Sequence, residues 1–371
     1  MSESPLVSVT VCVRDGGHWV DACLDSLLKQ THRPLEIIAV NDGSSDDTKT
    51  KLDTWQNLHE DNEVPIRIIH QDSLGLSAGR MAAVEQSNGK WIAITDIDVR
   101  PEPDWIEQML LASKPLANES IAAVTGRTVF QAHDDVVSRF RAVEIASKYR
   151  NRPRKTSLAN GPCSMFLRKA LVEVGGFDPT WYHAEDMELS LRLLSNGGTI
   201  IHAPDALVSH VPEIGIRRFL HKRRRDARAH VRIVRHFPAR QRNGPGFDFI
   251  GSASIAFSIL PIVLVMLLSF IPMIMAFPLE DDLLSMWQTN LAFGGLMLGV
   301  LIELLFWRGP LGVITRSLKK DGKGPQLFLS ISVRILIFRW SIALWQGLAL
   351  GALDALFSRN GHKRLFSRTI T

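Results

Sequence analysis

The stretch Trp91-Ile-Ala-Ile-Thr-Asp-Ile-Asp98 decides the fold of this chain. Its first four residues are apolar and predict a buried strand, and two carboxylates close it. In an extended strand, side chains two residues apart point to the same side, so Asp96 and Asp98 can converge on one hard cation. Ligands of open α/β sheets bind at the carboxyl ends of the strands, where this pair lies. Acidic pairs also close many strands as solvated turns, so the neighbouring segments must decide between the two interpretations.

Strands and helices alternate on both sides of this stretch. The apolar runs Val7–Val13 and Leu35–Val40 predict two further strands, and a helix is expected over His18–Gln30. The segment Asn41–Thr48 combines a glycine turn with residues that cap and begin helices. The periodic segment Met187–Leu194 predicts a later helix. This alternation is typical of a doubly wound, mostly parallel α/β sheet.

Six short motifs stand in an order and spacing that resemble one enzyme family. They are Val11-x-Val-Arg-Asp15, Val40-Asn-Asp-Gly-Ser44, Gly75-Leu-Ser-Ala-Gly-Arg80, Asp96-x-Asp98, Gly175-Gly-Phe-Asp178 and Glu185-Asp186. Residues 1–213 therefore resemble a cytosolic family 2 glycosyltransferase domain. The resemblance implies the GT-A fold, a Rossmann-like mixed sheet that binds a nucleotide sugar. Asn41 and Met81 depart from the family pattern, which has an aspartate and an asparagine there, but neither is a candidate metal ligand or base.

The resemblance assigns donor-side roles. Asp96 and Asp98 would hold Mg²⁺ or Mn²⁺ against the donor diphosphate, and His210 is either a structural histidine or a further ligand near the diphosphate. Arg80 would approach the nucleotide or its phosphates, and Asp42 would accept a hydrogen bond from the nucleobase. The predicted donor-binding residues are Arg14, Asp15, Asp42, Arg80 and Asp96.

Asp186 is the predicted general base. In an inverting transfer the acceptor hydroxyl loses its proton as it attacks, and Glu185 would raise the pKa of its neighbour by like-charge repulsion. Two carboxylates at a helix start also favour the helix dipole, so a structural role is the alternative. The predicted acceptor-side segment is Asn160, Gly161, Pro162 and Cys163.

Two long apolar segments follow this domain. Residues 249–279 and residues 283–302 contain no charge, and each exceeds or approaches the roughly 20 helical residues that cross a bilayer. Transmembrane helices are therefore expected at 249–279 and 283–306. Residues 327–356 predict a third membrane-embedded or interfacial helix, because Arg339 lies within that apolar stretch.

A strongly basic segment precedes the apolar ones. From Arg217 to Arg242 the chain has eleven Lys and Arg and one acid, Asp226. Residues 214–243 therefore predict an amphipathic helix on a membrane with anionic lipids, and nucleic acid is not an expected partner. The apolar segments predict a multi-pass cell-membrane protein, and the positive-inside rule predicts that its catalytic domain is cytoplasmic. The residues expected at the membrane surface are Arg217, Arg218, Lys222, Arg223, Arg224 and Arg225.

The sequence thus predicts a metal-dependent inverting glycosyltransferase that acts on a hydroxyl of a membrane-held acceptor, such as a lipid-linked saccharide. A polyprenyl-phosphate glycosyltransferase, a processive polysaccharide synthase and an inactive membrane scaffold are the alternatives. An ionised phosphate acceptor has little need of a base, so Glu185 and Asp186 favour a hydroxyl acceptor. The synthases carry a Gln-x-x-Arg-Trp segment near the membrane, whereas this chain has His221-Lys-Arg-Arg-Arg225.

Overall fold

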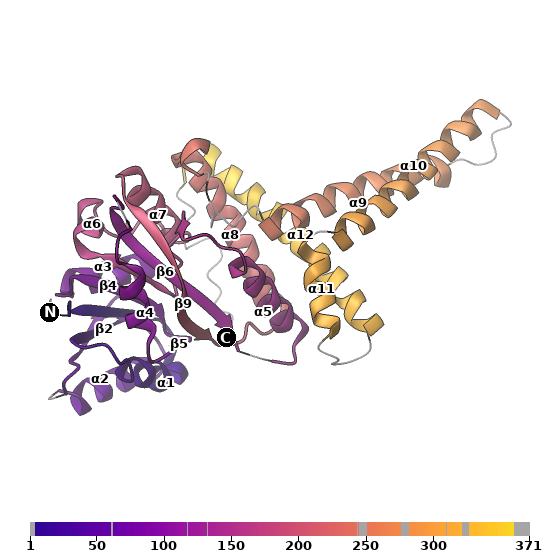
Figure 1. The fold of residues 1–371 in the computed structure, drawn as a ribbon. Coiled ribbons are helices and arrows are strands. Elements are labelled where there is room, and N and C mark those ends of the chain that lie inside the picture. Colours follow the sequence, from indigo (N-terminus) through magenta and orange to yellow (C-terminus); the bar gives the residue numbers. More distant parts are fainter. Residues whose placement is uncertain are drawn as a thin grey trace.

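The computed structural model describes residues 4–60, 62–116, 118–131, 133–242, 244, 251–275, 282–308, 310–320 and 326–359. Its N-terminal part is a nine-stranded mixed sheet covered by helices (Figure 1). The strands run in the order β3-β2-β1-β4-β8-β6-β9-β5, and β7 pairs with β9. Their bounds are β1 Val7–Val13, β2 Leu35–Asp42, β3 Ile66–Gln71, β4 Trp91–Asp96, β5 Val99–Pro101, β6 Ile121–Phe130, β7 Lys155–Thr156, β8 Ser164–Leu167 and β9 Thr199–His210.

The three strands predicted from apolar runs are confirmed as β1, β2 and β4. They are parallel to one another, with Cys12 opposite both Val40 and Asp96. β8 then joins β4 in the antiparallel direction, which makes the sheet mixed, as the GT-A prediction requires. The predicted helices are present, with slightly shifted ends, as α1 Gly17–Leu28 and α7 Glu185–Ser195.

Helices cover both faces of the sheet, and the parallel strands β1, β2 and β4 are buried almost throughout on both sides. On one face, α1 and α4 (Trp105–Ala112) bury Leu24 and Trp105 against β1 and β4. On the other face, α3 (Leu76–Gln86), α6 (Arg168–Glu173) and α7 pack around Phe166 and Phe177. Helix α2 spans Thr48–Leu58. Such two-sided burial is what produces near-continuous apolar runs in parallel strands.

The chain reverses direction across the sheet between β1 and β4. From β1 it proceeds outward to β2 and β3, and it returns to the other side of β1 at β4. The loops at the carboxyl ends of β1 and β4 therefore diverge, and open α/β sheets bind their ligands in the crevice that results. This topology places the loop after β1, the end of β2 and the Asp96-x-Asp98 motif at one edge.

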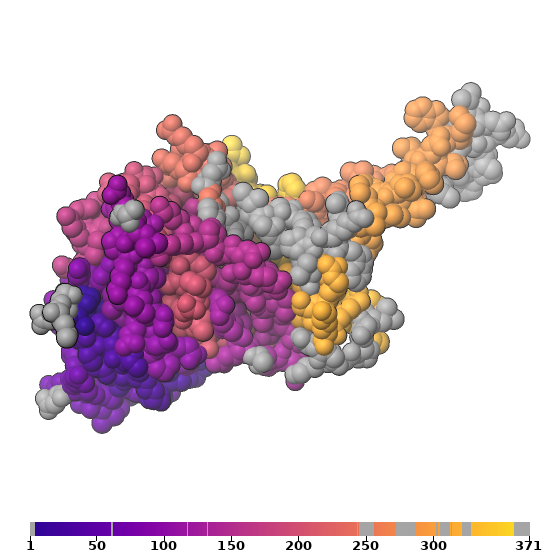
Figure 2. Space-filling view, viewed as in Figure 1, coloured from indigo at the N-terminus to yellow at the C-terminus, as the bar shows by residue number. Residues whose placement is uncertain are grey.

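Helices form the rest of the described chain. They are α5 Val136–Tyr149, α8 Ile216–His236, the 3₁₀ turn Ala239–Gln241, α9 Gly251–Met275, α10 Asp282–Arg308, α11 Pro310–Lys320 and α12 Gln326–Leu356. Figure 1 shows α9 and α10 side by side, projecting away from the sheet domain, and Figure 2 shows the same projection in space-filling form. Helix α11 was not predicted from the sequence.

The predicted membrane segments agree only in part with these helices. Within the described residues, one helix, Phe328–Leu356, is long and apolar enough to cross a membrane, and half of its most apolar window is buried inside the protein. The apolar part of α9, Ala256–Ile271, is shorter. The two-span prediction over 249–279 and 283–306 is therefore not confirmed, and residues 249, 250 and 276–279 lie outside the described part of the chain.

Helix α8 occupies a different environment from the predicted membrane surface. Its apolar face packs on protein: Phe219 contacts the rings of Phe140 from α5 and Trp340 from α12. Phe219, Ala227 and Ile233 are fully buried. The expectation that residues 214–243 lie with their apolar face on lipid is thus corrected, because α5 and α12 already cover that face. Residue 243 lies outside the described chain.

Two glycines set the close approach of α12 to α8. A Cβ atom on Gly347 would lie 2.2 Å from the carbonyl oxygen of Arg224, and one on Gly351 would lie 2.7 Å from Val231. Small residues four apart on one helix allow backbones to approach in this way. A side chain larger than hydrogen at Gly347 or Gly351 would therefore keep α12 and α8 farther apart than they are.

Gly347→Ala should destabilise the full chain by about 1–3 kcal/mol, because the new methyl group meets a backbone atom that has to shift. The thermal unfolding midpoint in a nonionic detergent measures the effect. Gly294→Ala in α10 is the matched control, since a Cβ there meets nothing within 4 Å. Equal midpoints for the two variants would contradict the proposed close contact.

Candidate active site

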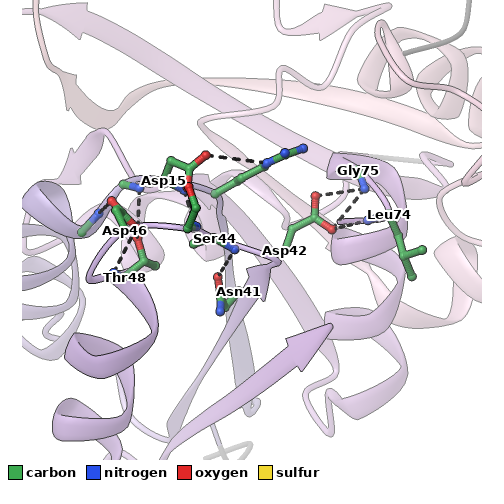
Figure 3. A network of polar contacts seen from close by, with 12 residues as sticks. Asp15, Asn41, Asp42, Ser44, Asp46, Thr48, Leu74 and Gly75 are labelled. Atoms are coloured by element: carbon green, nitrogen blue, oxygen red, sulfur yellow. Dashed lines mark hydrogen bonds and ion pairs between the residues drawn. The ribbon is translucent and has the colours of Figure 1, made fainter. Parts of the chain in front are cut away.

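Loops at the carboxyl ends of β1 and β2 are joined by a network of carboxylates and backbone amides (Figure 3). The Asp42 carboxylate accepts hydrogen bonds from the amides of Leu74 (2.7 Å) and Gly75 (2.9 Å) and from the Gln71 side chain (2.7 Å). Asp15 accepts from the Ser45 amide at 2.7 Å. Asp42 therefore fixes the end of β2 to the start of α3. This is a structural role, and the contact of Asp42 with a nucleobase stays a prediction.

Arg80 lies at the centre of the site and is 2% exposed. One guanidinium nitrogen donates to Glu185 at 2.7 Å and another donates to Asp96 at 3.0 Å. A guanidinium presents donors in a rigid planar fork, so it can hold two carboxylates from different elements in one plane. The structure thus links the end of β4 to the start of α7 through a single buried side chain. Arg80 is therefore a buried residue and not an arginine of the helix surface.

Glu185 and Asp186 begin α7 after Ala184, whose φ of 59° is in the left-handed region. The Asp186 carboxylate accepts hydrogen bonds from the amides of Gly161 (3.1 Å) and Met187 (2.8 Å). Burial raises the pKa of Asp186, although Arg80 and these two amides oppose the rise. Burial also raises the pKa of Glu185, and Arg80 opposes it. The two carboxyls therefore differ in partner: Glu185 is paired with a cation and Asp186 is held by amides.

The candidate metal ligands are divided between two places. Asp98 Oδ1 lies 3.6 Å from Nε2 of His210, at the end of β9, whereas Asp96 is directed to Arg80. Nδ1 of His210 lies 2.7 Å from the carbonyl oxygen of Val211, a distance at which its N–H donates to that oxygen. Among the described residues, no group of three His, Cys, Asp or Glu is arranged to hold an ion. An oxygen and a nitrogen donor that face each other nevertheless fit a divalent cation whose other ligands come from substrate and water.

The predicted acceptor-side segment is also divided. Gly161 and Pro162 line the cavity described below. Asn160 instead donates to the Tyr149 hydroxyl at 2.7 Å. Cys163 is fully buried, accepts from the Trp105 indole at 3.3 Å, and has its pKa raised to about 12 by burial. Cys163 is therefore a core residue rather than an acceptor contact.

Part of the predicted site faces a cavity of about 550 Å³, whereas Asp15, Asp98, Asn160, Cys163 and His210 are not among the residues that line it. The predicted residues that line it are Arg14, Asp42, Arg80, Asp96, Gly161, Pro162, Glu185 and Asp186. Residues from α5, α8 and α12 that the sequence analysis missed also line it, namely Glu144, Lys148, Arg223, Arg225, Asp226, His230, Trp340 and Leu344. The donor-side edge of the sheet and the C-terminal helices thus enclose one space.

The six basic residues predicted to lie at a membrane surface have different surroundings. Arg217 and Arg218 are exposed. Lys222 lies 3.7 Å from the buried Glu213. Arg223 and Arg225 line the cavity. The spacing of Arg223, Asp226 and His230 on one helical face was the available signal for this inward-facing polar stripe.

Comparison with known proteins agrees with this geometry. The sequence model described as "Glycosyl transferase family 2" matches residues 8–175. This matched stretch, slightly less than half of the chain, is similar to family 2 glycosyltransferase domains. The match includes Asp42, Arg80, Asp96 and Asp98, and it ends before Glu185 and Asp186.

Two relatives are similar to this chain over a longer stretch than the family model covers. The pre-mycofactocin glycosyltransferase of Mycobacterium tuberculosis (strain CDC 1551 / Oshkosh) is 28% identical over 211 residues, which are 55% of this chain and 42% of that protein. The glycosyltransferase AglE of Haloferax volcanii is 24% identical over 216 residues, or 56% of this chain and 68% of that protein. The chain thus spans about two fifths of the first relative's length and about two thirds of the second's.

A solved structure confirms the GT-A-like fold. The mannosyltransferase PcManGT from Pyrobaculum calidifontis, in complex with GDP-Man and Mn²⁺, superposes with a TM-score of 0.56 over 96% of this chain and 88% of its own. The sequence identity is 19%, so this likeness establishes the fold alone. It covers the C-terminal helices as well as the sheet domain.

Arg80→Met should destabilise the protein by about 3–5 kcal/mol, because Glu185 would remain buried without its cation. The loss should be larger near pH 8 than near pH 5. Removing Arg80 raises the pKa of folded Glu185 further above its unfolded value, and the stability that such a group contributes is lost as the pH rises through the folded pKa.

Chemical denaturation of the purified chain at both pH values measures this effect. Arg168→Met, at an exposed position, is the matched control and should change little at either pH. A pH-independent loss for Arg80→Met would mean that packing, rather than the charge on Glu185, determines the stability.

Proposed function

We propose that the chain is a metal-dependent inverting glycosyltransferase that moves a sugar from a nucleotide donor to a hydroxyl of a membrane-held acceptor. The observation that carries the proposal is a single cavity that joins donor-side and acceptor-side groups. Asp42, Arg80 and Asp96 line it from the sheet edge, and Asp186 lines it from α7. The family 2 domain supplies the reaction class.

Asp98 and His210 are the proposed resident ligands of Mg²⁺ or Mn²⁺. A bound divalent ion would supply positive charge for the departing diphosphate. Arg80 holds Asp96 beside this place and adds a fixed cation at the floor of the cavity. His210 is kept in orientation by its Nδ1 contact and by stacking on Phe130, with ring centroids 4.5 Å apart.

Asp186 is the proposed general base. Its two amide contacts hold the carboxylate at the cavity wall, and its raised pKa makes it a better proton acceptor than an exposed aspartate. Glu185 is engaged by Arg80 and is proposed to orient Arg80 rather than to take the proton. This assignment favours a hydroxyl acceptor over an already ionised phosphate.

Membrane attachment is proposed from the C-terminal helices. Helix α12, the candidate span, contributes Trp340 and Leu344 to the cavity wall, so an acceptor held in a bilayer can reach Asp186 along that helix. The projecting helices α9 and α10 expose many large apolar side chains, including Leu264, Leu267, Leu268, Trp287, Phe293, Leu296 and Val300. We propose that this pair inserts in the membrane and that the sheet domain faces the cytoplasm, in keeping with the basic α8.

Asp98→Ala should lower transfer by orders of magnitude and leave the fold intact, because it removes an anionic ligand from the cation. Activity with and without EDTA, together with the circular dichroism spectrum, tests this expectation. Asp205→Ala is the matched control, since Asp205 is an exposed residue of β9. An Asp98→Ala enzyme that keeps full activity in EDTA would disprove metal dependence.

Asp186→Asn should reduce turnover by about 10²–10⁴-fold and leave nucleotide binding nearly unchanged. The wild-type rate should rise with pH and level off above the raised pKa of Asp186, since the base works only when deprotonated. Turnover, nucleotide affinity and the pH profile are measured together, with Asp205→Asn as the control. Near-normal turnover would indicate an acceptor that arrives ionised, and the polyprenyl-phosphate alternative would then be the better account.

A further inference from the structure

A second, basic cavity opens between α8, α12 and the loop that precedes α7. Its lining consists of Tyr182, His183, Arg225, Arg228, Ala229, Arg232, Arg235, Gly351, Asp354 and Arg359. It shares Tyr182, His183 and Arg225 with the catalytic cavity, so the two spaces adjoin. Five arginines and one carboxylate therefore converge beside the catalytic cavity. None of the residues proposed above to bind the donor, to hold the metal or to act as the base lines this second cavity.

We infer that this cavity binds the phosphate group of the acceptor's lipid carrier. The inference rests on the proposed function and specifies its acceptor. Arginine guanidinium groups recognise phosphate oxygens through paired, charge-assisted hydrogen bonds. The cavity lies where α8 meets the C-terminal end of α12, the one described helix that is long and apolar enough to cross a membrane, so a lipid carrier beside α12 would bring its phosphate to these arginines.

Two of the five arginines are held in place before any ligand binds. Arg228 donates two hydrogen bonds to Asp354 of α12, at 2.5 and 2.8 Å. Arg232 lies over the Trp181 ring at 3.9 Å and donates to the Thr180 carbonyl at 2.6 Å. Preorganised side chains lose less rotamer entropy on binding, so this arrangement favours capture of an anion.

The remaining lining supports an anionic ligand. Burial lowers the pKa of His183 to about 2, and the charge of Arg225 adds to this effect. The ring is therefore neutral, and no carboxylate is required in the cavity to balance it. Asp354 is already engaged by Arg228. Arg235 and Arg359 also line the cavity and are both exposed, so the cations of the lining outnumber its single carboxylate.

The position also suits a glycan whose other end reaches Asp186. Arg225 contributes to both cavities, and Gly351 of α12 lies on the second. A carrier phosphate seated among the arginines would leave its lipid chain along α12 and its saccharide in the catalytic cavity. Binding of the carrier phosphate in the second cavity would thus position the acceptor hydroxyl in the catalytic cavity.

The test is direct binding to the full chain in a nonionic detergent. The probes are dodecyl phosphate, the uncharged dodecanol and inorganic phosphate, titrated into the wild type, Arg235→Gln/Arg359→Gln and Arg240→Gln. Arg235 and Arg359 line the second cavity and not the first, and Arg240 is an exposed arginine in the neighbouring 3₁₀ turn. Dodecyl phosphate affinity should fall by roughly tenfold in the double variant and remain unchanged in Arg240→Gln. Dodecanol binding should be the same in all three proteins.

Equal dodecyl phosphate affinity in the wild type and the double variant would overturn the inference. An equal loss in Arg240→Gln would do so as well, since it would indicate a general effect of charge. Inorganic phosphate that binds the wild type as tightly as dodecyl phosphate would assign the cavity to a free anion and exclude the lipid carrier. The assay contains no nucleotide sugar and no metal, so its failure leaves the proposed transfer intact, and absence of transfer would leave the binding result intact.

Discussion

The buried guanidinium of Arg80 is the constraint on which the active site depends. It joins Asp96, at the end of a sheet strand, to Glu185, at the start of a helix from the other half of the domain. A buried cation without these carboxylates would be strongly unfavourable, and so would the buried carboxylate of Glu185 without the cation, whereas Asp96 is partly exposed. The donor edge and the acceptor helix are therefore positioned together, and Asp186 is placed at the cavity wall by the residue next to it.

The C-terminal helices complete the lining of this site. The basic α8 lies between the sheet domain and α12, with its apolar residues covered by protein and two of its arginines at the cavity. Helix α12 contributes apolar side chains to the same cavity. The cavity wall thus combines a polar floor from the sheet with a partly apolar wall from the helix that is long enough to cross a bilayer. Such a wall suits an acceptor with a polar and an apolar part.

Local sequence patterns predicted the parts of the structure that depend on local physics. Apolar runs closed by acids located β2 and β4, and the side chains at their ends do line the cavity. Partners that are distant in sequence were not predictable in this way: nothing near Arg80 indicates that Glu185 lies against it. Helix α8 was predicted to lie on lipid because it is basic and has an apolar stripe. The sequence of such a stripe is the same whether lipid covers it or a protein residue such as Trp340 does. Cys163 was misassigned because a motif gives its position along the chain and not the direction of its side chain.

The contact of Gly347 and Gly351 with α8 has a mechanical consequence. At this crossing the two backbones are so close that neither helix can roll or slide without the other. If α12 spans the bilayer, a change in lipid thickness that alters its tilt must also move α8, and with it Arg223 and Arg225 at the cavity. The thickness of the surrounding membrane would then set the width of the catalytic space, and the lipid environment would act on turnover without any contact with the reacting groups.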